Sequence, residues 1–304
     1  DIMTIEQTAP HLVTAFSGKS RAFVEIQNGC DHRCTFCIIP YGRGNSRSVP
    51  MGKIVEHIRT LVENGYKEVI LTGVDVTSYG HDLPGQPNLG QLVEKVLKLV
   101  PSLPRLRLSS IDGVEIDDRL FHLITEDKRV MPHVHLSLQS GDNMILKRMK
   151  RRHSRETAID IVEKMQTVRP EITIGADIIA GFPTEDDAMF ENSLRMIDEC
   201  RIVFGHIFPY SAKAGTPAAL MPQVAPPVIK ERARLLRNKV AENFANWQSA
   251  LIGSRQNIVV ELGGRSGHCE NFAYVELDAP AEEGLILPVE IRAVENGKLQ
   301  AKQI

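Results

Sequence analysis

Short apolar runs alternate with amphipathic segments along most of the chain. The runs predicted as strands occupy residues 22–27, 68–72, 105–110, 133–138, 172–178 and 202–208. Between them, apolar residues recur every three or four positions, which predicts helices over 51–65, 89–100, 117–125, 154–168 and 185–200. This alternation indicates βα units and a parallel sheet. Six units fall short of the usual eight of a closed barrel. We therefore expect an α/β fold, a partial (β/α)6 TIM-like barrel, with a doubly wound sheet as the alternative.

The pattern changes after Pro209. Pro226 and Pro227 interrupt the chain, and a long helix is expected over 228–251. The next segments are strand-like and separated by turn signals, at 257–262, 272–277, 285–294 and 299–304. They predict a small all-β barrel. The expected division is a leader or linker over 1–20, the partial barrel over 21–225, a connecting helix over 226–252 and the β-barrel over 253–304.

Composition and charge are those of an ordinary globular protein. The 304 residues are 42% hydrophobic and 24% charged, and the formal net charge of −2 gives no global sign of nucleic-acid binding. No run approaches 18 apolar residues, so no membrane span is expected. Five cysteines, with Cys200 and Cys269 isolated, do not form a secreted disulfide framework. We expect a cytoplasmic protein and, because the chain begins at Asp1, a piece of a longer one.

Three cysteines, Cys30, Cys34 and Cys37, follow the first predicted strand. The C-x3-C-x2-C spacing brings three thiolates into one small volume. A cubane iron–sulfur cluster held by three thiolates keeps one iron open to a substrate or cofactor. Structural zinc is the alternative, but it requires four closed ligands, and His32 is the only nearby fourth candidate. A disulfide would leave one cysteine over. The pattern favours the cluster.

Polar residues and glycines follow the ends of other predicted strands. Thr72, Gly73 and Asp75 lie at the end of the second strand, Gln139 follows the fourth, and Asp177 belongs to the fifth. The carboxyl ends of parallel strands meet at one edge, so we expect these residues to lie near the cysteines. Each also has an ordinary interpretation, as a turn glycine, a loop amide or a satisfied core acid.

Several sequence motifs of the chain resemble those of the radical S-adenosylmethionine (SAM) enzymes, and most closely those of the methylthiotransferases. The runs that carry the resemblance are QNGC at 27–30, CIIPYGRG at 37–44, RSVP at 47–50, LSLQSGD at 136–142, GFP at 181–183, FPYS at 208–211 and GTPA at 215–218. The similarity extends from about residue 21 to the C terminus, where the final module is similar to the RNA-binding TRAM barrel.

The branch of the family is indicated by runs 71–75, 107–111 and 206–211, which resemble the bacterial MtaB type. That branch converts N6-threonylcarbamoyladenosine at tRNA position 37 to its 2-methylthio form. Sister branches act on isopentenyladenosine in tRNA or on an aspartate of a ribosomal protein. A zinc-stabilised RNA-binding protein without catalysis is the alternative from another class.

The resemblance implies a [4Fe-4S] cluster on the three cysteines, with SAM on its open iron. The implied reaction is reductive cleavage of SAM to a 5′-deoxyadenosyl radical, because no side-chain acid or base breaks an aromatic C–H bond. The SAM amino group is expected near Thr72, Gly73 and Asp75. The candidates for its carboxylate or ribose are Ser110, Gln139, Arg151 and Asp177. Phe36 either shields the cluster or simply packs.

The resemblance also implies partners and a further domain. The expected partners are tRNA with an ANN-decoding anticodon loop and a flavodoxin-like or other low-potential reductant. The family carries an N-terminal domain whose three additional cysteines hold a second [4Fe-4S] cluster, and that domain is absent from this sequence. We therefore expect the chain as given to bind SAM but not to complete sulfur insertion. The oligomeric state stays open.

Two basic segments are candidate RNA contacts, although solvated surface is the ordinary interpretation of each. One is the run 147–155, and the other is a predicted helix face with Lys230, Arg232, Arg234, Arg237 and Lys239. The terminal module has five basic and eight acidic residues over 253–304, so its formal charge is −3. This sign opposes phosphate binding, and Phe272 and Tyr274 are its only aromatics for base stacking.

Overall fold

The computed structural model describes residue 3 and residues 20–304 of the chain. The predicted leader over 1–20 therefore lies outside the described residues, apart from Met3 and Ser20. Within the described ranges no helix combines the length and the apolar character that a membrane crossing needs.

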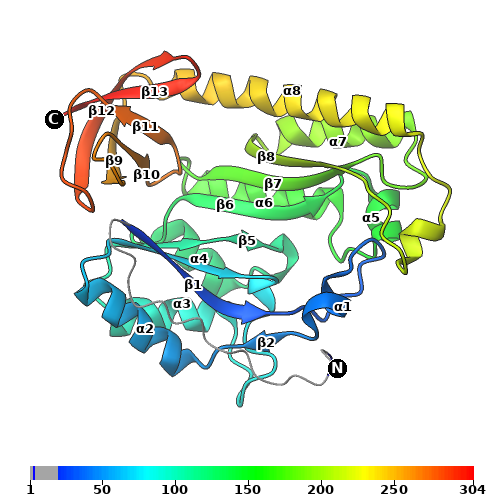
Figure 1. Ribbon diagram of the computed structural model, residues 1–304, viewed down its shortest axis with the longest axis horizontal. Coiled ribbons are helices and arrows are strands. Elements are labelled where there is room, and N and C mark those ends of the chain that lie inside the picture. Colours follow the sequence, from blue (N-terminus) through cyan, green and yellow to red (C-terminus); the bar gives the residue numbers. More distant parts are fainter. Residues whose placement is uncertain (1–2, 4–19) are drawn as a thin grey trace.

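Parallel strands form a half-barrel in which neighbours in sequence are also neighbours in space (Figure 1). These strands are β1 (Arg21–Asn28), β3 (Glu68–Gly73), β4 (Arg105–Leu108) with its continuation β5 (Ser110–Ile111), β6 (His133–Gln139), β7 (Thr173–Ala180) and β8 (Ile202–Pro209). A doubly wound sheet reverses its strand order at a switch point, and this sheet does not. The predicted partial barrel is confirmed, and the doubly wound alternative is wrong.

Helices follow the strands and cover the convex side of the half-barrel. They are α2 (Met51–Glu63), α3 (Leu89–Leu99), α4 (Asp118–Glu126), α6 (Arg155–Val168), α7 (Asp187–Glu199) and α8 (Pro226–Ala250). Each lies within two residues of its predicted bounds. The elements that the periodicity missed are short: α1 (Ile39–Arg43), β2 (Arg47–Ser48), α5 (Asn143–Met149) and the 3-10 turns η2 (Val76–Ser78), η3 (Gly113–Glu115) and η4 (Pro217–Leu220).

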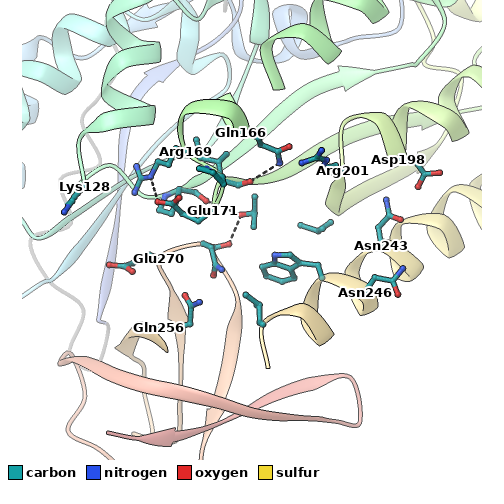
Figure 2. A pocket seen from close by; sticks show the side chains of 18 residues that line it. Lys128, Gln166, Arg169, Glu171, Asp198, Arg201, Asn243, Asn246, Gln256 and Glu270 are labelled. Carbon is teal, nitrogen blue, oxygen red and sulfur yellow. Dashed lines mark hydrogen bonds and ion pairs between the residues drawn. The ribbon is translucent and has the colours of Figure 1, made fainter. Parts of the chain in front are cut away.

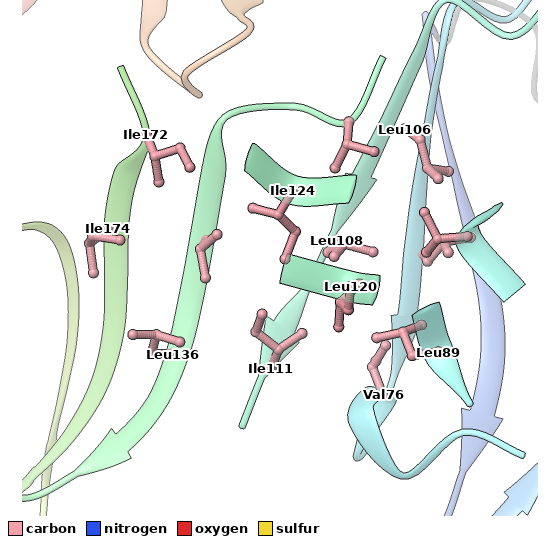
Figure 3. Close-up of a cluster of buried hydrophobic side chains, with 14 of the residues drawn as sticks. Val76, Leu89, Leu106, Leu108, Ile111, Leu120, Ile124, Leu136, Ile172 and Ile174 are labelled. Atoms are coloured by element: carbon pink, nitrogen blue, oxygen red, sulfur yellow. The ribbon is translucent and has the colours of Figure 1, made fainter. Parts of the chain in front are cut away.

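The core of the half-barrel lies between the strands and the helices. Figure 3 shows apolar side chains of the strands, among them Leu108, Leu136 and Ile174, gathered with Leu120 and Ile124 of α4. These positions alternate with polar residues that face the concave side of the sheet. Two chemically different surfaces therefore result from one strand pattern.

The C-terminal strands form a closed barrel in the order β10-β11-β13-β12-β9. They are β9 (Arg255–Val260), β10 (Ser266–Cys269), β11 (Tyr274–Leu277), β12 (Ile286–Glu295) and β13 (Lys298–Gln303). The small barrel is confirmed, but β10 was not predicted. A strand was predicted over 272–277, but β11 begins only at Tyr274. Phe272 adopts a left-handed turn conformation, with φ 71°, and therefore lies outside the strand.

The β-barrel packs against the amino ends of the parallel strands, and α8 runs along β8 toward it (Figure 1). Arg107 is 2% exposed and donates to the Glu270 carbonyl at 3.0 Å. Thr173 donates to the Asn271 carbonyl at 2.7 Å. The barrel therefore closes the end of the half-barrel opposite to the carboxyl ends of the strands.

Candidate functional site

The cysteine loop folds back tightly at the carboxyl end of β1. Gly29 has φ +75°, and a Cβ added there would lie 2.0 Å from the Asn45 carbonyl oxygen. Next to it, the Cys30 amide donates to the Gly44 carbonyl at 3.1 Å, and the Cys37 amide donates to the Cys34 carbonyl at 3.1 Å. Only glycine fits the first position, because both the space and the backbone conformation exclude a side chain.

Gln27 joins this loop to the loop that follows β3. Its side chain is fully buried; Nε2 donates to the Gly29 carbonyl at 2.7 Å, and Oε1 accepts from the Asp75 amide at 2.8 Å. A Cβ on Gly73 would lie 2.8 Å from the Gln27 carbonyl oxygen. Gly73 therefore lets two strand ends approach each other.

The three cysteine side chains open into one cavity of about 270 Å³ at the carboxyl ends of the strands. This cavity brings together eight of the ten predicted site residues: Cys30, Cys34, Cys37, Asp75, Ser110, Gln139, Arg151 and Asp177. The other two, Thr72 and Gly73, are not among its lining residues. The binding roles expected for these residues stay predictions.

Two further polar residues that line the cavity, Asp112 and Ser137, were not among the predicted site residues, and His32, considered from the sequence only as a zinc ligand, lines it as well. Asp112 is buried and directly follows β5, so the strand-end rule that selected Asp75 also applies to it. The hydroxyls of Ser137 and Ser110 lie 2.9 Å apart.

Arg151 is held rigidly at the wall of the cavity. Its Nη2 donates to Asp112 Oδ2 at 2.9 Å and to the Ser137 carbonyl at 2.8 Å. Its Nη1 lies 3.8 Å from Cys34 Sγ, and its buried Nε has no hydrogen-bond partner among the described residues. A fixed guanidinium beside the cysteines suits the binding of an anionic group such as a carboxylate.

The chemistry of the three thiols fits a metal cluster. Burial and the neighbouring Asp75 carboxylate raise the pKa of the Cys30 thiol to about 12, and burial also raises the pKa of Cys37. A bound metal reverses this preference, since it deprotonates the thiols that coordinate it.

A closed zinc site would need His32 as its fourth ligand, and that side chain is already engaged. The Nε2 atom of His32 lies 3.0 Å from Asp75 Oδ2 and 2.9 Å from Arg152 Nη2. The hydrogen bond to Asp75 raises the pKa of His32, although burial opposes this shift. The arrangement favours three thiolates and an open position.

A larger cavity of about 670 Å³ lies at the opposite end of the strands, between α6, α8 and the β-barrel (Figure 2). Its charged side chains balance one another, and they are Lys128, Arg169, Arg201, Glu171, Asp198 and Glu270. Volume alone would favour it as an active site. It contains no cysteine, so we place the candidate active site in the smaller cavity.

Several residues of the basic segments already have partners within the chain. In the run 147–155, Arg152 pairs with Glu115 at 2.7 Å and Arg148 donates to Thr184 Oγ1 at 2.8 Å. On α8, Arg232 is buried and pairs with Glu185 at 3.0 Å. The predicted exposed basic face of α8 is therefore wrong at Arg232.

Comparisons with known proteins agree with this geometry. The profile of the Radical SAM superfamily matches residues 24–197. The chain is 53% identical over 300 residues to the threonylcarbamoyladenosine tRNA methylthiotransferase MtaB of Rickettsia prowazekii, covering 99% of this chain and 71% of that protein. It is 39% identical over 226 residues to a tRNA-2-methylthio-N(6)-dimethylallyladenosine synthase of Staphylococcus saprophyticus, covering 74% of this chain and 44% of that protein.

Solved structures share the fold at low sequence identity. The radical SAM methyltransferase TsrM from Kitasatospora setae superposes with a TM-score of 0.53 at 15% identity, covering 66% of this chain and 39% of that one. Methylornithine synthase (PylB) gives a TM-score of 0.50 at 16% identity, covering 75% and 63%.

Most of the half-barrel, with the three cysteines at the carboxyl end of its first strand, lies in the segment that the Radical SAM profile matches, so the fold and the site together define a radical SAM enzyme. The chain belongs to the radical SAM superfamily and, within it, to the MtaB group of methylthiotransferases. It is thus a transferase, and the Radical SAM superfamily to which it belongs uses a [4Fe-4S] cluster and SAM.

Proposed function

We propose that the chain carries the radical step of a tRNA methylthiotransferase that adds a methylthio group to C2 of N6-threonylcarbamoyladenosine-37. The observation that carries this proposal is the 53% identity over 99% of the chain to a relative named for that base. Relatives named for dimethylallyladenosine are 33–39% identical, so we propose that base only as the alternative substrate.

Within the site, we assign Cys30, Cys34 and Cys37 as the ligands of the cluster. When bound, the cluster supplies the electron that cleaves SAM. Arg151 is suited to orient the SAM carboxylate, because its guanidinium is fixed and one nitrogen faces the cysteines. Phe36 lines the cavity and packs edge-on against Phe182, with ring centroids 6.3 Å apart, so it is placed to keep water away.

The polar residues opposite the cysteine loop complete the assignment. Ser110 and Gln139 offer hydroxyl and amide groups to the ribose or amine of SAM, whereas the Asp177 carboxylate is engaged by His135 and His206. Thr72 and Gly73 do not line the cavity; their proposed role is to support the loop that carries Asp75. The proposed partners are the anticodon loop of a tRNA and a low-potential reductant, and the proposed location is the cytoplasm, where both occur.

The radical step is tested by anaerobic reconstitution with iron and sulfide, followed by measurement of 5′-deoxyadenosine. We expect about four irons per chain and SAM cleavage in the parent protein, and loss of both in Cys34→Ala. Cys200→Ala is the matched control, because this cysteine is buried at the end of α7, outside the cavity. A colourless, zinc-loaded parent protein would contradict the proposal.

The substrate is tested separately by the acceleration of SAM cleavage. The reconstituted chain is offered tRNA with threonylcarbamoyladenosine, tRNA with isopentenyladenosine, or a ribosomal protein. We expect the first to accelerate 5′-deoxyadenosine formation most. Preference for either of the others would transfer the assignment to that branch without affecting the assignment of the cysteines.

A further inference from the structure

Three neighbouring parallel strands present a histidine, an aspartate and a histidine to the concave side of the half-barrel. His135 lies on β6, Asp177 on β7 and His206 on β8. The Nε2 atom of His135 is 3.0 Å from Asp177 Oδ1, and the Nδ1 atom of His206 is 3.1 Å from the same oxygen. One ligand atom from each residue lies within 4.8 Å of the other two.

The position of His135 is built into the sheet. Its partner in register on β7 is Gly175, where an added Cβ would lie 2.3 Å from His135 Nδ1. The imidazole therefore occupies the space that any other residue would fill. Its side chain is only 10% exposed, and rigid adjacent strands hold all three groups in place.

Among the described residues, no lysine or arginine forms an ion pair with Asp177. Its only hydrogen-bond and ion-pair partners within residues 20–304 are the two histidines. A second cluster, His32 with Asp75 and Glu115, also has three ligand types close together, but there Arg152 lies 2.7 Å from Glu115 and supplies the cation. Only the first cluster leaves its carboxylate available to a metal ion.

The cluster is also accessible. Asp177 lines the cavity into which the three cysteines open, and the side chain of His206 is 65% exposed. Two imidazoles and one carboxylate with open positions are a ligand set that suits divalent first-row transition metals. In the absence of a metal, the same nitrogens can donate hydrogen bonds to the carboxylate.

We propose that His135, Asp177 and His206 bind a divalent transition-metal ion, distinct from any iron held by the cysteines. Because Asp177 lines the cavity of the cysteines, an oxygen-bearing group of a substrate bound there could coordinate the ion. This proposed metal site does not depend on which substrate the enzyme modifies.

Metal binding is tested on the full chain carrying Cys30→Ala, Cys34→Ala and Cys37→Ala, so that the thiols do not compete. Co²⁺ is titrated by calorimetry and by visible absorption. We expect one Co²⁺ per chain and, in the His206→Ala background, affinity weaker by about 100-fold or more, since loss of even an outer-shell partner costs 10–100-fold.

His268→Ala is the matched control. His268 pairs with Glu261 at 2.7 Å and belongs to no three-ligand cluster among the described residues, so its loss should leave Co²⁺ affinity unchanged. Absence of binding in the parent, or equal affinity in His206→Ala, would overturn the proposal and leave the cluster a hydrogen-bonding network. If the triple variant does not fold, Co²⁺ uptake by the cluster-reconstituted chain with and without His206→Ala gives the same comparison.

Discussion

At the scale of residues, the candidate site depends on places where backbone segments meet without room for a side chain. Gly29 brings the cysteine loop against the segment before β2, and Gly73 brings the β3 end against Gln27. Gln27 then bonds both loops. The cysteines are therefore held in place by groups that carry no chemistry of their own.

Gly29→Ala should lower the stability of the protein and its cluster content. The added Cβ would lie 2.0 Å from a backbone oxygen, and residue 29 has a φ of +75°, which alanine rarely adopts. We expect the resulting strain to lower the free energy of unfolding by about 1–3 kcal/mol. Urea unfolding and iron content after reconstitution measure it. Gly42→Ala is the control, because a Cβ there meets nothing within 4 Å; equal losses in both variants would contradict the argument.

Arg151→Lys should weaken SAM binding by about tenfold or more, because lysine keeps the charge but loses the planar guanidinium, in which Nη2 bonds Asp112 and Ser137 while Nη1 faces Cys34. Equilibrium binding of SAM to the reconstituted protein measures the change. Arg148→Lys, whose parent side chain bonds Thr184 outside the cavity, should bind SAM normally. Unchanged binding in Arg151→Lys would remove this residue from the site.

At the scale of elements, apolar and polar side chains alternate strictly along β6, so one face of the strand packs in the core and the other faces the concave side of the sheet. Val134, Leu136 and Leu138 are buried in the core, whereas His133 and His135 face the concave side. Long periodic segments of this kind were predicted to within two residues. Short elements such as α1, α5 and β2 were not, because they contain too few residues to show a period.

His133 makes the stability of the fold sensitive to pH. Burial, and next the positive charge of Arg107, hold the pKa of His133 well below its usual value of about 6.5. The unfolded chain takes up a proton near pH 6.5 and the folded chain does not. The stabilising contribution is therefore present above pH 6.5 and is lost as the pH falls below it.

Relative to His133→Phe, the free energy of unfolding of the parent should fall by up to about 1.4 kcal/mol per pH unit below pH 6.5. Urea unfolding of both proteins at pH 7.5, 6.5 and 5.5 measures this difference. Phenylalanine suits the site because the ring stacks on Phe272 and contacts Phe204 edge-on. His135, His206 and His268, which also act on His133, are present in both proteins; parallel pH profiles would contradict the prediction.

At the scale of the whole molecule, the C-terminal barrel seals the amino end of the half-barrel. Arg105 and Arg107 are buried between Glu68 and backbone carbonyls of the barrel. Phe272 stacks on His133, with ring centroids 4.5 Å apart. Phe272, one of the two aromatic residues considered for base stacking, is therefore engaged within the protein. Like the acidic charge of the module, this argues against RNA binding by the β-barrel.

Phe272→Ala should destabilise the protein by up to about 3 kcal/mol, the low end of the range for aromatic truncations, because Phe272 is only partly buried; it should also increase amide exchange in β4 and β6. Urea unfolding and hydrogen exchange measure the two effects. Tyr274→Ala is the control, because Tyr274 is 40% exposed and should cost little. Similar costs for both substitutions would argue against sealing by Phe272.

The sequence alone determined the succession of strands and helices and the three-cysteine loop, because periodicity and spacing are local properties of the chain. Only the tertiary structure decided that Asp112 and Ser137 join the cysteines, that Arg232 is buried, and that His135 and His206 share Asp177. These outcomes depend on which strands become neighbours and on how closely they approach. Residues far apart in sequence come into contact only when the half-barrel folds around its core.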